Sequence, residues 1–186
     1  MRGRLILVVG PSGVGKDSII AGAAECCRDD ARIIFARRFI TRPAAAGGED
    51  HAAVTPGEFA AMRDSGGLML HWQAHGLEYG LPASLGDQLA RGRLVVANVS
   101  RTVVTEARRN FPTTIVVAIL ASPETLALRL AARGRETADG IKRRLGRAAS
   151  LGPVEADIVI DNDGPLAAAV GSFVALLREA ASHPSG

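Results

Sequence analysis

The 186-residue sequence is poor in aromatic residues, with one Trp, one Tyr and five Phe. It contains no aromatic motif on which nucleobases could stack, so we expect no nucleic-acid partner despite its clustered arginines. Cysteine is equally scarce, because only Cys26 and Cys27 are present and they are adjacent. Neighbours on one predicted helix cannot easily bridge each other, so we expect both thiols to pack as small apolar groups and to bind no metal.

Long apolar runs are also absent. No run approaches the roughly 20 residues of a membrane-spanning helix. The N-terminal run, 5–9, is too short and wrongly flanked for a signal peptide, so we expect a cytoplasmic protein with no membrane partner. The length and the hydrophobic content of 47% predict one globular domain over 1–186, as a monomer or a homodimer.

Lysine is the rarest charged residue, since Lys16 and Lys142 are the only lysines among 22 Lys and Arg residues. Lys16 ends a glycine-rich segment, 10–16, with the letters GPSGVGK. The apolar run before it predicts a buried strand, and the apolar pattern after it predicts a helix that begins at Gly15 or Lys16. A glycine-rich turn between a strand and a helix is the context that a phosphate-binding loop requires.

The residue types in this turn suit phosphate. Gly10, Gly13 and Gly15 tolerate positive φ, so backbone N–H groups can curl around phosphate oxygens. The helix N-terminus adds unpaired N–H groups, and Lys16 adds a positive charge for the β- and γ-phosphates. The alternative, a glycine-rich turn that binds nothing, explains the lone lysine less well. We therefore predict an ATP site made of Gly10, Pro11, Ser12, Gly13, Val14, Gly15, Lys16, Asp17 and Ser18.

The position after Lys16 departs from the usual motif, which has Ser or Thr there to ligate magnesium. Here that position is Asp17, and Ser18 follows it. Either the Asp17 carboxylate holds Mg²⁺ directly or through water, or the Ser18 hydroxyl takes over. Both residues are candidate metal ligands.

The rest of the chain alternates between predicted strands and predicted helices. Strands are expected at 5–9, 32–35, 94–97, 114–120 and 158–160, and helices at 82–91, 100–110, from 122, 137–150 and 166–180. This alternation predicts an α/β fold with a central parallel sheet flanked by helices, and a nucleotide at the carboxyl ends of the strands. Between them, 37–81 is predicted as a small insertion with a helix capped by Thr55 and Glu58 and a hairpin of 68–74 with 76–79.

Three separated blocks resemble the guanylate kinase group of P-loop kinases, and the resemblance covers nearly the whole chain. Segment 10–16 resembles its ATP site, 41–43 its substrate-phosphate segment and 129–136 its lid. The resemblance implies a core of 1–36, 82–132 and 150–182, an acceptor-binding subdomain of about 37–81 and an arginine-rich lid of about 133–149. Taken singly, the arginines could equally form a solvated helix face.

Site residues follow from the same resemblance. It implies that Lys16, Arg129, Arg133 and Arg144 surround the transferring phosphoryl group while a closing lid excludes water. It places Asn162 near the adenine of ATP. It further implies that Arg42 and Tyr79 hold a phosphate of the acceptor.

The residues that would read a guanine base are missing. His71 stands where guanylate kinases have a glutamate before the tryptophan, and Asn98 and Ser100 replace aspartates. His51 replaces a tyrosine, and Ala44 or Ala45 replaces a second phosphate-binding arginine. A site without its buried acceptor for a base should lose discrimination by orders of magnitude, so GMP is a poor candidate.

The sequence resembles more closely a sister family, the ribose 1,5-bisphosphate phosphokinases of phosphonate breakdown, through segments 15–18, 40–43, 133–136 and 162–164. This implies that ATP, with Mg²⁺, phosphorylates the sugar bisphosphate to 5-phosphoribosyl 1-diphosphate. Candidates for the second phosphate and the ribose hydroxyls are Arg37 or Arg38, His51, His71 and His75. The alternatives are a nucleoside monophosphate kinase acting on GMP and a non-catalytic guanylate-kinase-like interaction module.

Overall fold

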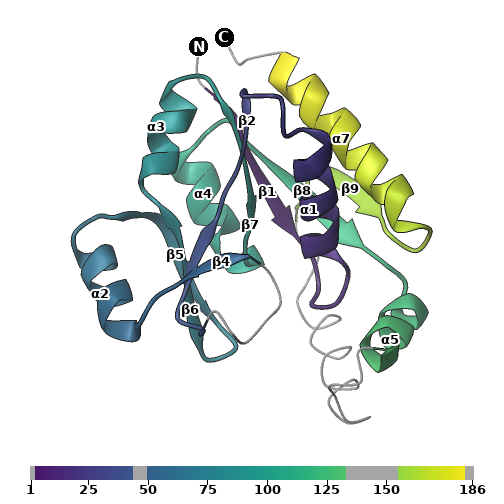
Figure 1. The fold of residues 1–186 in the computed structure, drawn as a ribbon, viewed down its shortest axis with the longest axis horizontal. Helices are drawn as coiled ribbons and strands as arrows, with labels where there is room; N and C mark the ends of the chain where they lie inside the picture. Colours follow the sequence, from purple (N-terminus) through teal and green to yellow (C-terminus); the bar gives the residue numbers. More distant parts are fainter. Residues whose placement is uncertain (1–2, 44–49, 133–154, 183–186) are drawn as a thin grey trace.

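The computed structural model describes residues 3–43, 50–132 and 155–182, which form two sheets and their covering helices (Figure 1). The larger sheet has the order β2-β7-β1-β8-β9, and all of its neighbouring strands run parallel. Its strands are β1 (Leu5–Val9), β2 (Ile33–Phe35), β7 (Leu94–Asn98), β8 (Thr114–Leu120) and β9 (Ile158–Asp161).

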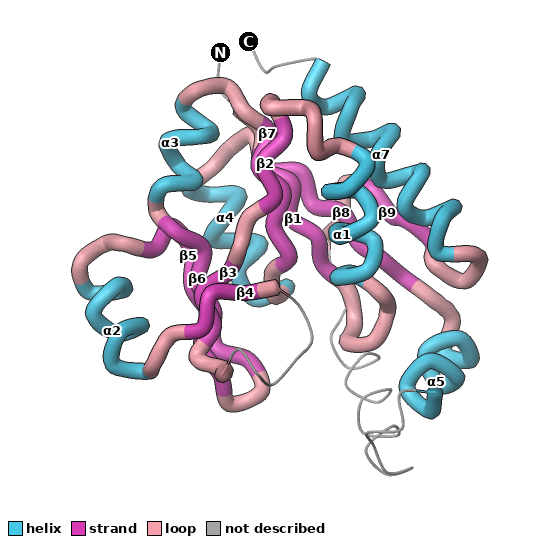
Figure 2. The backbone as a smooth tube through the Cα atoms, in the orientation of Figure 1, coloured by secondary structure: helices cyan, strands magenta, loops and turns pink. Residues whose placement is uncertain are grey.

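Strand β1 lies at the centre of this sheet, and all five of its residues are buried. Because side chains alternate along a strand, Leu5 and Leu7 pack on one face and Ile6 and Val8 on the other. Helices therefore cover both faces, as Figure 2 shows. The Ile6 face packs against α1 (Lys16–Cys26) and α7 (Leu166–Ser182), and the Leu5 face against α3 (Ser84–Ala90) and α4 (Val104–Asn110).

The smaller sheet has the order β4-β3-β6-β5 and lies beside the carboxyl half of the main sheet (Figure 1). Its strands are β3 (Arg38–Ile40), β4 (His51–Ala53), β5 (Leu68–Ala74) and β6 (Leu77–Pro82), and helix α2 (Pro56–Asp64) accompanies them. Leu70 and Leu81 belong to the same buried cluster as Leu5 and Val95 of the main sheet. Shared apolar burial therefore holds the two sheets together.

The predicted α/β architecture is confirmed, with differences at element ends. Strands β3 and β4 were not predicted, because three residues give no readable alternation. The helix expected from Pro82 begins at Ser84, since Pro82 still pairs with Leu68 in the sheet. The helix expected over 100–110 is a 3-10 helix, η2 (Arg101–Val103), followed by α4.

Two other expectations gave mixed results. The capping box of Thr55 and Glu58 is present at the start of α2. Cys27 is buried as expected, whereas the expectation for Cys26 was wrong, because its side chain is exposed at the end of α1. Helix 137–150 and the lid of about 133–149 lie outside the described residues. No helix in the described part of the chain is both long and apolar enough to cross a membrane.

Candidate functional site

The glycine-rich segment forms the turn from β1 into α1. Gly13 and Gly15 have φ of 87° and 97°, the left-handed conformation that glycine adopts without strain. The turn curls so far that the Lys16 ammonium donates to the carbonyl oxygens of Gly10 at 2.8 Å and Pro11 at 3.0 Å. The lysine charge therefore lies inside the loop, where backbone N–H groups and the α1 N-terminus converge.

The pKa of Lys16 is depressed by its place inside the loop. Its pKa is lowered from 10.5 to about 8, chiefly by burial; the attraction of Asp17 opposes this shift, and repulsion by Arg38 and Arg101 adds to it. Lys16, Arg38 and Arg101 are nevertheless three cationic side chains that act on one another at the loop. A group of cationic side chains suits a polyanion such as a chain of phosphates.

Two of the predicted nucleotide-site residues meet at Val14 in the loop. Asn162, which directly follows β9, is buried, and its Nδ2 donates to the Val14 carbonyl at 2.7 Å. Arg129, on α5 (Pro123–Ala132), donates from Nη1 to the same oxygen at 3.4 Å. Asn162 thus holds the loop through its main chain at Val14. Its predicted contact with adenine stays a prediction. Arg133 and Arg144 lie outside the described residues.

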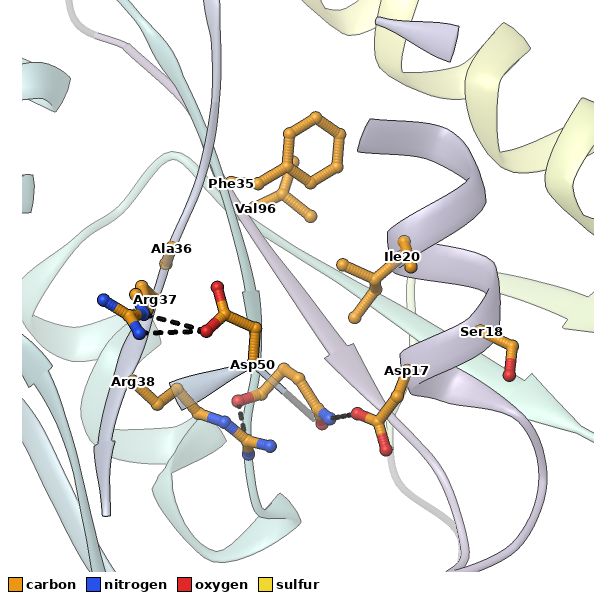
Figure 3. A pocket seen from close by; sticks show the side chains of 11 residues that line it. Asp17, Ser18, Ile20, Phe35, Ala36, Arg37, Arg38, Asp50 and Val96 are labelled. Carbon is orange, nitrogen blue, oxygen red and sulfur yellow. Dashed lines mark hydrogen bonds and ion pairs between the residues drawn. The ribbon is translucent and has the colours of Figure 1, made fainter. Parts of the chain in front are cut away.

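A pocket of about 400 Å³ adjoins the loop on the side of the smaller sheet (Figure 3). Apolar side chains, among them Ile20, Phe35 and Val96, form part of its wall. Its polar lining consists of Asp17, Ser18, Arg37, Arg38, Asp50 and Asn98. The pocket adjoins the first turn of α1, so a molecule bound in it would lie next to a ligand held by the loop.

Arg38, which is predicted to bind the acceptor, lines this pocket and is buried. Its guanidinium lies 5.5 Å from the centre of the Tyr79 ring, and Nη1 donates to the Asn98 carbonyl at 3.0 Å. Tyr79 is itself stacked on Trp72, with ring centres 5.5 Å apart. Burial lowers the pKa of Arg38 to about 10, so the group is still a cation at neutral pH.

Arg42 and His51, also predicted to hold the acceptor, contact each other. His51 Nε2 lies 3.1 Å from the Arg42 carbonyl oxygen, and His51 Nδ1 lies 3.4 Å from Arg42 Nη2. His51 is buried on β4, which pairs with β3, and its ring therefore restricts the position of Arg42 just after β3. Its predicted contact with substrate stays a prediction.

His71 is not brought together with the other predicted acceptor residues. It is exposed on β5, and strand alternation places it on the opposite face from Trp72, whose cross-strand partner is Tyr79. Within the described ranges, no hydrogen bond or ion pair joins the His71 side chain to another residue.

Asp17 and Ser18 are exposed on the first turn of α1. Asp17 Oδ1 accepts a hydrogen bond from Asn98 Nδ2 at 2.6 Å. Both side chains offer the oxygen atoms that Mg²⁺ prefers. No cluster of three or more His, Cys, Asp or Glu side chains that could hold a metal occurs among the described residues, so protein groups alone form no cage there. A phosphate-bound Mg²⁺ with one or two protein ligands fits these residues.

Sequence reasoning did not assign a role to three residues around the loop and pocket. Asp50 pairs with Arg37 at 3.0 Å across the pocket, Asn98 contacts Asp17, and Arg101 repels Lys16. The sequence does contain a signal that could have identified Asn98 and Arg101 as site residues. They follow the apolar run 94–97, at the carboxyl end of a parallel strand, where α/β proteins bind their ligands.

Comparison with known proteins gives a family. No protein-family model matches the sequence. The chain is 48% identical over 182 residues to the ribose 1,5-bisphosphate phosphokinase PhnN of Acidiphilium cryptum, covering 98% of this chain and 96% of that protein. It is 45% identical over 182 residues to the same-named protein of Rhodopseudomonas palustris, covering 98% and 92%.

Among solved structures, guanylate kinase from Anaplasma phagocytophilum has the same fold. The TM-score is 0.71 at 19% identity, covering 96% of this chain and 86% of that one. The loop and pocket described above therefore lie in a guanylate-kinase-like fold, and the near full-length identity goes beyond fold. This chain belongs to the ribose 1,5-bisphosphate phosphokinase family.

Proposed function

We propose that this protein transfers the γ-phosphoryl group of ATP to ribose 1,5-bisphosphate and so forms 5-phospho-α-D-ribose 1-diphosphate and ADP. The observation that carries the proposal is the junction of the two sites, because the pocket that holds Arg38 begins at Asp17 and Ser18 of the phosphate loop. Relatives named for this reaction are 45% and 48% identical over nearly the full chain.

In this reaction a phosphate oxygen of the acceptor attacks the γ-phosphorus of ATP, and the bond from that phosphorus to the bridging oxygen of ADP breaks. Positioning and charge stabilisation do most of the catalytic work in such transfers. Lys16 inside the loop and Arg129 beside it supply two of the cations. We assign Arg133 and Arg144 to the same role from the resemblance, in a lid that excludes water.

Asp17, Ser18 or both would hold a Mg²⁺ ion together with the phosphates of ATP. The ion neutralises phosphate charge as it develops in the transfer. The exposed oxygens of these residues at the start of α1 support this assignment.

The residues on the acceptor side suit a compact sugar that carries two phosphates. Arg38 and Arg42 supply cationic donors for phosphate, and Tyr79 lies under the Arg38 guanidinium. His71 stands where a guanylate kinase has the glutamate that reads guanine, and Asn98 stands where it has an aspartate. We therefore assign Arg38, Arg42, Tyr79, His51 and His71 to acceptor binding, with the core, acceptor subdomain and lid divided as the resemblance implies.

The test is a coupled assay of ADP release with ribose 1,5-bisphosphate and with GMP as acceptors, side by side. We expect diphosphate product from the sugar and almost no turnover of GMP. Faster turnover of GMP would replace the proposal with a nucleoside monophosphate kinase. Lys16→Ala serves as the control, because it should remove most of the rate by loss of phosphate positioning. A wild-type protein that binds no ATP by calorimetry in the presence of magnesium would indicate an interaction module.

A further inference from the structure

Two departures from the guanylate kinase pattern meet in one hydrogen bond. Asp17 stands where the loop motif has Ser or Thr, and Asn98 stands where that group has an aspartate. The residues are 81 positions apart, yet Asn98 Nδ2 donates to Asp17 Oδ1 at 2.6 Å. Figure 3 shows this contact as the dashed line that ends at Asp17.

The chemistry of the two positions is complementary. A carboxylate at position 17 needs a donor at position 98, and the amide of Asn98 supplies one. An aspartate at position 98 would instead place two carboxylates at hydrogen-bond distance, and like charges so close disfavour ionisation of both. A hydroxyl at position 17, by contrast, could donate to an aspartate at position 98.

Asn98 is held firmly enough to orient its partner. It is the last residue of β7, its Cα pairs with Val8 of the central strand, and its carbonyl accepts from Arg38 Nη1 at 3.0 Å. Its side chain thus contacts the phosphate loop while its main chain contacts the acceptor pocket. In the described part of the chain, the other carboxylate oxygen of Asp17 makes no hydrogen bond.

We propose that Asn98 is a positioning residue that fixes one carboxylate oxygen of Asp17 and leaves the other for the metal bound to ATP. Positions 17 and 98 then form one unit, in which Asp17 with Asn98 replaces the hydroxyl and carboxylate of the guanylate kinase pattern. The inference rests on the proposed use of ATP with magnesium.

The test is a double-mutant cycle of Asn98→Asp, Asp17→Ser and the variant with both changes. Calorimetry measures the Kd of ATP with excess Mg²⁺ and with a chelator, so the readout does not require turnover. We expect Asn98→Asp to weaken binding of the magnesium complex about tenfold or more, with the Kd of free ATP nearly unchanged, and the double variant to recover most of that loss. Additive effects of the two changes, or equal losses with and without Mg²⁺, would overturn the proposal.

Two controls keep the outcome clear. Asn110→Asp makes the same chemical change at an exposed position at the end of α4 and should leave both Kd values unchanged. Asn98→Ala removes the donor without adding a charge, so a smaller magnesium-specific loss is expected, and no such loss in a variant with native circular dichroism would contradict the inference. Failure of the proposed function is distinguishable, because the wild-type protein itself would then bind no magnesium–ATP.

Discussion

Asn162 and Val14 are 148 positions apart in the chain, and the Asn162 side-chain amide donates to the Val14 carbonyl at 2.7 Å. This buried contact ties the phosphate loop to the end of β9. A Cβ atom placed on the neighbouring Gly15 would lie 2.6 Å from the same amide nitrogen. The loop conformation therefore depends on a glycine and on a partner from the far end of the sheet.

Gly15→Ala tests this dependence. The native φ of 97° is strained for alanine, and the new methyl group would displace Asn162. We expect a loss of about 1–3 kcal/mol in the free energy of unfolding together with weaker ATP binding. Urea denaturation and calorimetry measure the two effects. Gly86→Ala is the matched control, because no atom lies within 4 Å of its added Cβ and alanine favours a helix interior. An unchanged stability in Gly15→Ala would contradict the role given to this contact.

The depressed pKa of Lys16 predicts how ATP affinity depends on pH. The free protein loses the lysine proton as the pH rises through about 8, whereas bound phosphates favour the charged form. ATP affinity should therefore fall from about pH 7 to about pH 9.5, approaching tenfold per pH unit at the upper end, and binding near the middle of this range should take up a proton. Calorimetry in two buffers of different ionisation enthalpy measures the uptake. Lys16→Arg should remove this slope, since arginine stays charged.

Asp17→Asn removes a charge from the proposed metal ligand while it keeps the shape of the side chain. The concentration of Mg²⁺ at half-maximal rate should rise roughly tenfold, and more than the KM of ATP rises. Magnesium titrations at fixed ATP measure the difference. Asp29→Asn is the control, because this aspartate is 96% exposed. An unchanged magnesium requirement would assign the ion to Ser18 and the substrate phosphates.

Arg38→Met separates acceptor binding from ATP binding. The variant keeps much of the apolar stem but loses the cation above Tyr79 and the bond to the Asn98 carbonyl. We expect the KM of the sugar bisphosphate to rise roughly tenfold to hundredfold, because hydrogen bonds to charged groups contribute about 1.5–3 kcal/mol. The Kd of ATP should change little. Arg109→Met, at an exposed position of α4, should alter neither constant. Equal losses for both ligands would show that Arg38 acts through the fold.

Much of the fold could be predicted from local pattern. β8 occupies 114–120 as predicted, because a run of β-branched residues between two turns is a local signal. The short strands β3 and β4 could not be predicted, since each has three residues and exists through pairing with a distant strand. Cys26 was misjudged for a related reason, because the face that a helix buries depends on what packs against it.

The sequence by itself determined the phosphate loop, its lysine and the unusual Asp17, because a loop of this kind depends on contiguous backbone conformations that glycine alone permits. Only the tertiary structure decided which side chains join it. The strand order places the carboxyl end of β7 beside that of β1, and this brings Asn98 to Asp17 and Arg101 near Lys16. The pairing of β3 with β6 within the smaller sheet likewise sets Arg38 over Tyr79. These contacts join residues far apart in the chain, and their geometry follows from sheet order and apolar packing, which no local spacing encodes.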